Sequence, residues 1–202
     1  TVIGTVGPFY EGSDYEFGWD FASKLQVPMV DEHYYVAPTW MINNQRYYDK
    51  YDRNKPKVYL GEYATWGNTL YNALSEALHL CNVERNADIV SMTSYAPLLA
   101  KEGFTQWNPD LIYFNSTDVK PTINYEVQKL FGNYSGEEYI ASDLTVDNPS
   151  AEIQKRIVQS VVRNKKNGNL IVKLVNLLPV ETTVELSNLK IHGSVIKRTV
   201  LR

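Results

Sequence analysis

The chain has 202 residues, 44% of them hydrophobic, and a formal net charge of -3. That length suits one domain of ordinary size or slightly more, and the hydrophobic content is too high for a disordered chain. The charge provides no basic surface for a phosphate backbone, so nucleic-acid binding is not expected. No apolar run reaches the roughly 18 residues of a membrane span and no secretory signal opens the chain, so no membrane partner is expected.

The chain is rich in aromatic residues, with 15 tyrosines and 4 tryptophans. Aromatic rings are the usual platforms for sugars, because the apolar face of a sugar ring stacks on them. Tyrosines are also common in cores and interfaces, and composition alone favours that ordinary explanation. The single cysteine, Cys81, cannot form an internal disulfide, so the compartment stays undetermined.

Strands and helices are expected to alternate through the first part of the chain. A strand at the start is followed by a helix over 15–25, with Asp14 as its N-cap. A strand over 27–35, a helix over 38–51 with Thr39 near its cap, and a strand over 57–64 come next. The pattern is typical of repeated βα units.

The clearest helix begins behind Asn68 and Thr69. Its apolar residues recur at three- and four-residue spacing: Leu70, Ala73, Leu74, Ala77, Leu78 and Cys81. A strand over 89–98, a long loop over 101–115 and a helix from about Pro121 to Phe131 follow.

The strand starts fall near residues 2, 27, 57 and 88, a spacing of roughly 30 residues that suits a parallel sheet of βα units. Four such units are too few for a closed (β/α)₈ barrel, which needs ~250 residues. The pattern therefore leaves two alternatives, a small open sheet or half of a barrel.

After about Gly136 the sequence becomes rich in β-branched residues. Strands are expected within 155–164, 169–178, 180–189 and 194–201, and Asn167-Gly168 is typical of a hairpin turn. This second region is predicted to be an antiparallel all-β unit.

Functional groups of parallel α/β folds gather at the carboxyl ends of the strands. The residues expected there are Asp31, Glu32, His33, Tyr34, Tyr35, Glu62, Tyr63, Ser94 and Tyr95. A carboxylate can attack an anomeric carbon while histidine and tyrosine hold its ionisation state, so the group suits a sugar.

Each of these residues also has a plain structural explanation. Glu62 is equally consistent with a solvated acid at a strand end, and His33 with a ring bonded to a backbone carbonyl. Asp31 and Glu32 fit loop acids or partners of neighbouring side chains better than direct chemistry.

Metal and nucleotide sites are not expected. The three histidines fall in separate elements, with His79 in a helix and His192 in the β region, so neither of these two is a catalytic candidate. The segment GTVG over 4–7 fits no nucleotide-binding fingerprint. No cofactor is therefore predicted.

Four motifs in order, VDEHYY, KVYLGEYA, SMTSYAPL and WNPDLIYFN, resemble glycoside hydrolase family 51, the α-L-arabinofuranosidases, and most closely the longer branch of gut bacteria, fungi and plants. The resemblance covers nearly the whole chain. It implies that residues 1–135 are strands five to eight of a (β/α)₈ TIM barrel and that residues 136–202 are an incomplete antiparallel C-terminal β-sandwich.

The resemblance also implies roles for individual residues. Glu62 corresponds to the catalytic nucleophile, and His33 and Tyr35 correspond to residues that contact the sugar and the nucleophile. Trp107 and Asn108 match a motif near the pocket and are expected to bind substrate. The implied substrate is a polysaccharide or oligosaccharide with terminal α-L-arabinofuranosyl units.

A retaining glycosidase needs a second carboxyl as acid and base. In the family this is a glutamate directly after an asparagine, and no Asn-Glu pair occurs in the chain. The chain is therefore expected to lack the first half of the barrel, to be truncated at both ends and to be inactive alone. Glu32 is the nearest candidate within the chain should a pair form.

A half barrel leaves two edge strands and an apolar face uncovered, so self-association is expected. Two other functions remain open. One is a non-catalytic carbohydrate-binding unit, and the other is a related retaining glycosidase such as a xylosidase or glucanase.

Overall fold

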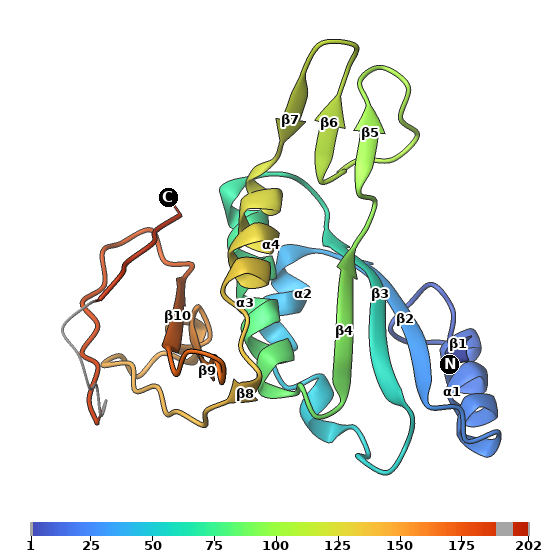
Figure 1. The fold of residues 1–202 in the computed structure, drawn as a ribbon, viewed down its shortest axis with the longest axis horizontal. Coiled ribbons are helices and arrows are strands. Elements are labelled where there is room, and N and C mark those ends of the chain that lie inside the picture. Colours follow the sequence, from blue (N-terminus) through green and yellow to red (C-terminus); the bar gives the residue numbers. More distant parts are fainter. Residues whose placement is uncertain (1, 189–195, 202) are drawn as a thin grey trace.

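The computed structural model describes residues 2–188 and 196–201. Its first part is a four-stranded parallel sheet of order β1-β2-β3-β4 (Figure 1). The strands are β1 (Ile3–Thr5), β2 (Met29–Val36), β3 (Lys57–Thr65) and β4 (Val90–Tyr95). Each strand pairs with the next one along the chain, which confirms the predicted parallel sheet and its four strands.

Two long helices connect these strands, α1 (Ser13–Lys24) and α3 (Leu70–Arg85). The prediction that α3 begins behind Thr69 is confirmed, because Thr69 and Asn72 cap each other reciprocally. The prediction that Asp14 caps α1 is wrong. Gly12 holds the cap position, and Asp14 lies in the first turn, where a negative charge favours the positive end of the helix dipole.

The helix predicted over 38–51 is shorter than expected. Helix α2 (Pro38–Asn43) begins with Ala37 rather than Thr39 at its cap, and a separate 3₁₀ turn, η1 (Tyr48–Lys50), follows. Two side chains hydrogen-bond to carbonyl groups of α2 and so end the helix. Asn44 donates to Trp40 O at 2.9 Å, and Gln45 donates to Ile42 O at 3.0 Å.

Three strands that the sequence analysis missed lie within or beside the long loop expected over 101–115. Strands β5 (Leu99–Lys101), β6 (Ile112–Phe114) and β7 (Val119–Pro121) form a small sheet of their own, which projects beyond the end of β4 (Figure 1). Each strand has three residues, which is too short for a recognisable alternation of apolar and polar positions.

Helix α4 (Ile123–Asn133) leads into the second region, where β8 (Glu138–Tyr139), the short helix α5 (Ala151–Gln154), β9 (Ile157–Arg163) and β10 (Leu170–Asn176) follow. The three strands form an antiparallel sheet of order β10-β9-β8. The predicted hairpin is confirmed: Gly168 adopts a φ of 76° in the loop between Arg163 and Leu170.

The two further strands expected in this region are not found. Residues 180–188 and 196–201 form no strand, and 189–195 lie outside the described residues. The apolar positions Val180, Val184 and Leu186 are 60%, 41% and 52% exposed. Within residues 2–188 and 196–201 no strand pairs with this segment, and its β-branched pattern does not produce a strand there.

Helix α3 lies at the centre of the molecule. Figure 1 shows α3 and α4 between the parallel sheet and the β9–β10 hairpin. Leu78 of α3 and Val158 and Val175 of the hairpin belong to one buried cluster. Glu84 of α3 accepts hydrogen bonds from Ser160 and Lys173. No helix in the described ranges is both long and apolar enough to cross a membrane.

Candidate active site

Strand β2 separates its side chains onto two faces of the sheet. Glu32, Tyr34 and Val36 are buried, whereas Asp31, His33 and Tyr35 are half-buried. Side chains of a strand alternate between faces, so the second set lies on the face away from the buried layer. We call this face of the β1–β4 sheet the open face.

A bulge at Gly61 brings Glu62 to the open face. Leu60 pairs with Glu32, and Glu62 pairs with His33, which leaves Gly61 as an extra residue in β3. Val58 and Leu60 are buried, so strict alternation would have buried Glu62 as well. The extra residue changes the direction of the strand and places Glu62 beside His33.

At the bulge, glycine is the residue that fits without displacing a neighbour. A Cβ added at position 61 would lie 2.0 Å from Asp31 Oδ1, far closer than two such atoms can approach. Asp31 therefore occupies the space that the missing side chain leaves, and any larger residue at 61 would displace it.

The open face collects three of the predicted site residues around one carboxylate. Tyr35 donates a hydrogen bond to Glu62 Oε2 at 2.7 Å, and His33 Nδ1 lies 3.7 Å from the same oxygen. Asp31 Oδ2 lies 3.0 Å from His33 Nε2 and holds the ring from its other side. The Glu62 side chain is 42% exposed, so its carboxylate is accessible to a ligand.

Tyr35 is suited to act as a neutral donor. Burial raises the pKa of its phenol, and the hydrogen bond to Glu62 and the charge of that carboxylate raise it further. The Tyr35 ring also lies beside Trp66, with ring centroids 6.5 Å apart. Trp66 is 62% exposed and presents an aromatic surface next to the carboxylate.

Of the nine residues predicted at the strand ends, four are buried on the other side of the sheet. Glu32 accepts hydrogen bonds from Trp19, Tyr48 and Tyr51 on the buried side of the sheet. Burial raises the pKa of its carboxyl more than these hydrogen bonds lower it. Glu32 is therefore turned away from Glu62 and does not complete a catalytic pair with it.

Tyr34, Tyr63 and Tyr95 are buried with Glu32 in the core. The expectation that they meet a sugar is wrong. Ser94, by contrast, bonds Tyr59 at 2.8 Å, and Tyr59 pairs with Asp31 across β2 and β3. Register thus places Tyr59 on the open face, where the sequence analysis had not placed it.

Trp107 and Asn108 lie between β5 and β6. Trp107 is 68% exposed, and Asn108 accepts a hydrogen bond from Tyr113 at 3.3 Å. Within residues 2–188 and 196–201, neither residue is hydrogen-bonded to Glu62, His33 or Tyr35. Their assignment to substrate binding stays a prediction.

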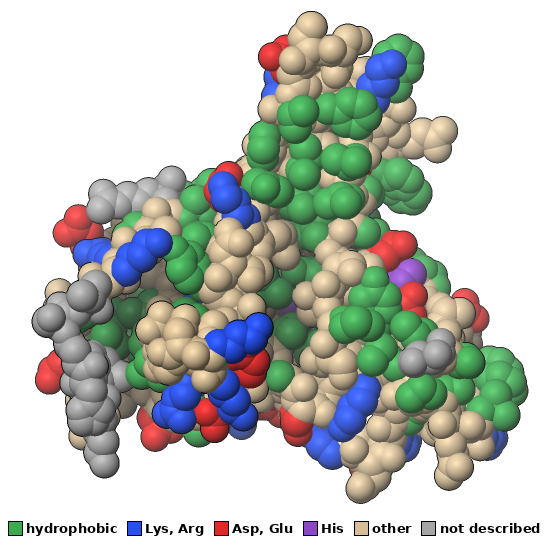
Figure 2. All heavy atoms as spheres, in the orientation of Figure 1, with side chains coloured by type: hydrophobic (Ala, Val, Ile, Leu, Met, Phe, Trp, Pro, Cys, Tyr) green, Lys and Arg blue, Asp and Glu red, His purple; other side chains and the backbone are tan. Residues whose placement is uncertain are grey.

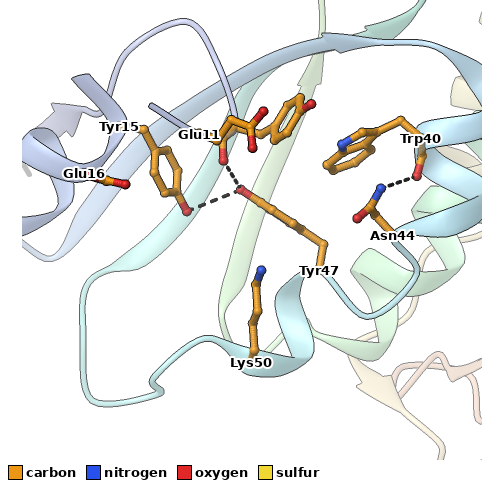
Figure 3. Close-up of a pocket in the computed structure, with 8 residues that line it drawn as sticks. Glu11, Tyr15, Glu16, Trp40, Asn44, Tyr47 and Lys50 are labelled. Carbon is orange, nitrogen blue, oxygen red and sulfur yellow. Dashed lines mark hydrogen bonds between the residues drawn. The ribbon is translucent and has the colours of Figure 1, made fainter. Parts of the chain in front are cut away.

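A cavity of about 340 Å³ lies apart from this site, beside α1 and α2 (Figure 3). Its walls include Tyr10, Trp40 and Tyr47, with Glu11 and Lys50 at its edge. The Tyr47 hydroxyl donates to Tyr10 O at 3.1 Å and lies 3.3 Å from the Tyr15 hydroxyl, so it already has hydrogen-bond partners. We place the chemistry at Glu62, because the carboxylate and its donors lie there.

His79 plays no part in the site. His79 is buried in α3 and bonded to Tyr34 at 2.8 Å, and burial lowers its pKa to about 4. His192 lies outside the described residues. In the part of the chain that the structure describes, no three His, Cys, Asp or Glu side chains are placed to hold a metal ion.

Comparison with known proteins identifies the family. The family model described as the α-L-arabinofuranosidase C-terminal domain matches residues 61–202, more than half of the chain. The chain belongs to this α-L-arabinofuranosidase family. The match begins at Gly61, one residue before Glu62, and includes Trp107 and Asn108. His33 and Tyr35 precede it.

Relatives of the chain are named α-L-arabinofuranosidases. An extracellular exo-α-L-arabinofuranosidase of Streptomyces chartreusis is 48% identical over 145 residues, which cover 72% of this chain and 18% of the relative. α-L-Arabinofuranosidase 1 of Arabidopsis thaliana is 31% identical over 85% of this chain and 26% of its own length. The chain thus spans about a fifth to a quarter of the relatives that it matches.

Solved structures agree with these relatives. An arabinose-bound α-L-arabinofuranosidase of glycoside hydrolase family 51 superposes with a TM-score of 0.67 at 32% identity, covering 74% of this chain and 26% of that one. The Thermotoga maritima enzyme gives a TM-score of 0.57 at 14% identity, covering 86% and 42%, and shows the fold alone. The predicted resemblance to the C-terminal portion of family 51 arabinofuranosidases is confirmed.

Proposed function

We propose that the chain carries the nucleophile of a retaining α-L-arabinofuranosidase that hydrolyses terminal α-L-arabinofuranosyl units of hemicellulose or pectin side chains. The observation that carries this proposal is the position of Glu62. Its accessible carboxylate accepts a hydrogen bond from Tyr35 and faces His33 on the open face of a parallel sheet. The names of the relatives support the choice of sugar.

In this mechanism Glu62 attacks the anomeric carbon and forms a covalent arabinofuranosyl ester. A second carboxyl protonates the leaving oxygen, and the same group then activates the water that releases arabinose with retention of configuration. Glu32 faces the core, so we assign the second carboxyl to a segment outside this chain. Alone, the chain is then inactive.

Each neighbour of Glu62 has a role in this scheme. Tyr35 stabilises the carboxylate before attack and, with His33, contacts the sugar. Asp31 holds His33 in place through the 3.0 Å contact. Trp107 and Asn108 are proposed to bind substrate from the segment between β5 and β6.

We further propose that β1–β4 are strands five to eight of a (β/α)₈ barrel, within residues 1–135, and that residues 136–202 form part of a C-terminal β-sandwich. Four parallel strands that pair in chain order support the first assignment. The antiparallel β8–β10 sheet supports the second. A segment that supplies the remaining strands would cover the open face.

Hydrolysis of 4-nitrophenyl α-L-arabinofuranoside tests the proposal. The chain alone should show no turnover above Glu62→Gln. A longer protein in which the preceding segment is present should turn over, and Glu62→Gln should abolish its activity. Glu126→Gln is the matched control and should retain activity, because Glu126 is an exposed carboxyl on α4 that pairs with Lys129.

The proposal fails in either of two cases. Activity of the longer protein that survives Glu62→Gln would disprove the nucleophile assignment. Turnover by the chain alone that Glu62→Gln removes would show that the second carboxyl lies within the 202 residues. A faster reaction with the corresponding xyloside would mean that the preferred substrate is another sugar than arabinofuranose. The role of Glu62 would stand.

The exposed Trp66 beside Tyr35 favours one further candidate, a unit that binds sugar without cleaving it. Arabino-oligosaccharide titration of the chain distinguishes the two. Binding by the chain together with an inactive longer protein would support the binding unit, and activity of the longer protein would exclude it.

A further inference from the structure

The most deeply buried carboxylate near the site belongs to Glu76 of α3, which is 0% exposed. Its Oε1 accepts hydrogen bonds from the Thr65 backbone N–H at 2.9 Å and the Thr65 hydroxyl at 2.8 Å. Its Oε2 accepts from Asn124 Nδ2 at 2.8 Å. Thr65 ends β3 three residues after Glu62, so Glu76 fixes the strand end that bears the nucleophile.

Two chains of hydrogen bonds lead to this carboxylate. In the first, Thr69 donates to Asn72 Oδ1 at 2.5 Å, Asn72 donates to the Thr65 hydroxyl at 3.2 Å, and Thr65 donates to Glu76. The chain anchors both ends of the short segment 65–69, which carries the exposed Trp66.

The second chain reaches the loop between β5 and β6. Asn68 Nδ2 donates to Asn124 Oδ1 at 3.1 Å and to Asp110 O at 3.3 Å, and Asn124 then donates to Glu76. Asp110 ends the segment that carries Trp107 and Asn108. One buried carboxylate therefore connects the segment after Glu62 with the segment predicted to bind substrate.

The direction of these bonds requires a charged acceptor. Every partner of Glu76 donates to it, so an ionised carboxylate satisfies all of them. A proton or an amide nitrogen on Oε2 would face the Asn124 NH₂ group. Asn124 would then have to rotate its amide, which would turn a donor toward Asn68 and break the link to Asp110.

We propose that Glu76 is a positioning residue that holds Trp66 and the Asp110 segment in place around Glu62. The catalytic consequence rests on the proposed function, whereas the structural part stands on the contacts alone. A buried carboxylate costs folding free energy, and here it provides fixed orientation at the segment after Glu62 and at the segment predicted to bind substrate.

The ionisation of Glu76 provides an independent measure of this role. Burial raises its pKa to about 7, although the hydrogen bonds from Thr65 and Asn124 lower it. Burial raises the pKa of Tyr63 on β3 and of Tyr95 on β4, and the charge of Glu76 raises both further, so these phenols stay neutral where Glu76 titrates. Both hydrogen-bond chains should be intact above pH 7 and lost as Glu76 takes up a proton.

The first experiment uses ¹⁵N NMR of the 202-residue chain at pH 8. Glu76→Gln should shift the Asn68 side-chain amide and the Trp66 indole resonance and should increase fast motion over residues 65–69. Glu126→Gln should leave all three unchanged. Unchanged Asn68 and Trp66 resonances in folded Glu76→Gln would overturn the proposal.

Should Glu76→Gln fail to fold, the unmodified chain gives the same answer. The Thr65 amide, the Asn68 amide and the Glu76 carboxyl carbon should titrate with one common midpoint. The same titration in His33→Asn, which removes the imidazole beside Glu62, should give the same midpoint if that midpoint belongs to Glu76. Midpoints for Thr65 and Asn68 that differ from that of the Glu76 carboxyl would overturn the proposal.

The second experiment separates positioning from simple stabilisation in the longer protein. At pH 8 Glu76→Gln should lower kcat/KM by roughly tenfold or more, because small displacements of site groups are costly. The same variant should unfold at a higher temperature, since it no longer buries a charge. If Glu76 were purely structural, its replacement would change kcat/KM and the unfolding temperature in the same direction. That result would refute a positioning role. Should Glu62→Gln leave activity intact, only the proposed function fails and the NMR result still decides the structural part.

Discussion

Among single residues, Tyr35 has the most direct contact with the candidate nucleophile. Its hydroxyl donates to Glu62 at 2.7 Å, and a hydrogen bond to a charged group contributes about 1.5–3 kcal/mol. Glu62 is partly exposed, so the lower end of that range applies. Tyr35→Phe should therefore reduce kcat/KM of the longer protein about tenfold.

Tyr59→Phe is the matched control for this change. Tyr59 lies on the same face but bonds Ser94 rather than Glu62. Steady-state kinetics with the nitrophenyl arabinofuranoside should leave Tyr59→Phe close to the unsubstituted protein. Equal losses in the two variants would show that the hydrogen bond to Glu62 has no special importance.

Gly61 is a second residue whose identity the structure explains. A methyl group at this position would meet Asp31 Oδ1, so Gly61→Ala should lower the free energy of unfolding by about 1–3 kcal/mol in urea titrations. Asp31→Ala removes the obstacle, and the double variant should lose little more than Asp31→Ala alone.

Gly132→Ala serves as the comparison, because nothing lies within 4 Å of its added Cβ in α4. This variant should gain about 0.5–1 kcal/mol. A Gly61→Ala protein as stable as the parent would mean that Asp31 yields without cost and that the bulge does not require glycine.

At the scale of elements, α3 combines a capped start with an unusually polar buried face. It buries Glu76 and His79 within one turn of each other. Both side chains are satisfied, Glu76 by Thr65 and Asn124 and His79 by Tyr34. The stability of this helix should therefore depend on pH through two groups that act in opposite directions.

His79 provides the clearer prediction. Its pKa is about 4 in the folded chain and 6.5 when unperturbed, because burial disfavours the charged ring. Above pH 6.5 both states are neutral and the stability is fully present. As the pH falls from 6.5 toward 4, His79 takes up a proton in the unfolded chain before it does so in the folded chain, and stability is lost.

His79→Gln keeps a neutral polar side chain that cannot take up this proton. The free energy of unfolding of the parent relative to this variant should fall by about 2–3 kcal/mol between pH 7.5 and pH 4.5. Urea unfolding at the two pH values measures the difference, and Glu76 is present in both proteins, so its contribution cancels. A pH-independent difference would contradict neutral burial of His79.

For the whole molecule, the sequence predicted the order of elements better than their details. The spacing of the strands near residues 2, 27, 57 and 88 was enough for the parallel sheet, since it reflects the length of a βα unit. Thr69 and Asn167-Gly168 were informative because capping and tight turns depend on local chemistry.

The bulge at Gly61 was not predictable in the same way. One extra residue leaves the apolar pattern of β3 unchanged but reverses the face on which Glu62 lies, and only the pairing of Glu62 with His33 reveals it. The separation of Glu32 from His33 could have been read from alternation alone, because Asp31, His33 and Tyr35 share one face of β2. The β5–β7 sheet depends on pairing between distant segments, which no single window of sequence contains.

The open face determines how the whole chain should behave in solution. Register places Ile3 of edge strand β1 on the same face as Asp31, and Met92 of β4 on the same face as Tyr59. These apolar side chains are 41% and 46% exposed. Figure 2 shows further apolar side chains gathered on the projecting β5–β7 sheet and below it. Exposed edge strands and apolar side chains on an uncovered face favour association with a second copy.

The 202-residue chain should therefore sediment as a dimer or larger species at micromolar concentration. Replacing Ile3 and Met92 together by lysine should shift it toward the monomer, because charged side chains on edge strands oppose pairing. Glu126→Gln on α4 should leave the distribution unchanged. The longer protein, in which we propose that the preceding segment covers the open face, should not associate through that face, so the lysine substitutions should not change its oligomeric state. A compact monomer of the unsubstituted chain at micromolar concentration would show that the face is stable without a partner and would remove the main physical reason for assigning a covering segment to it.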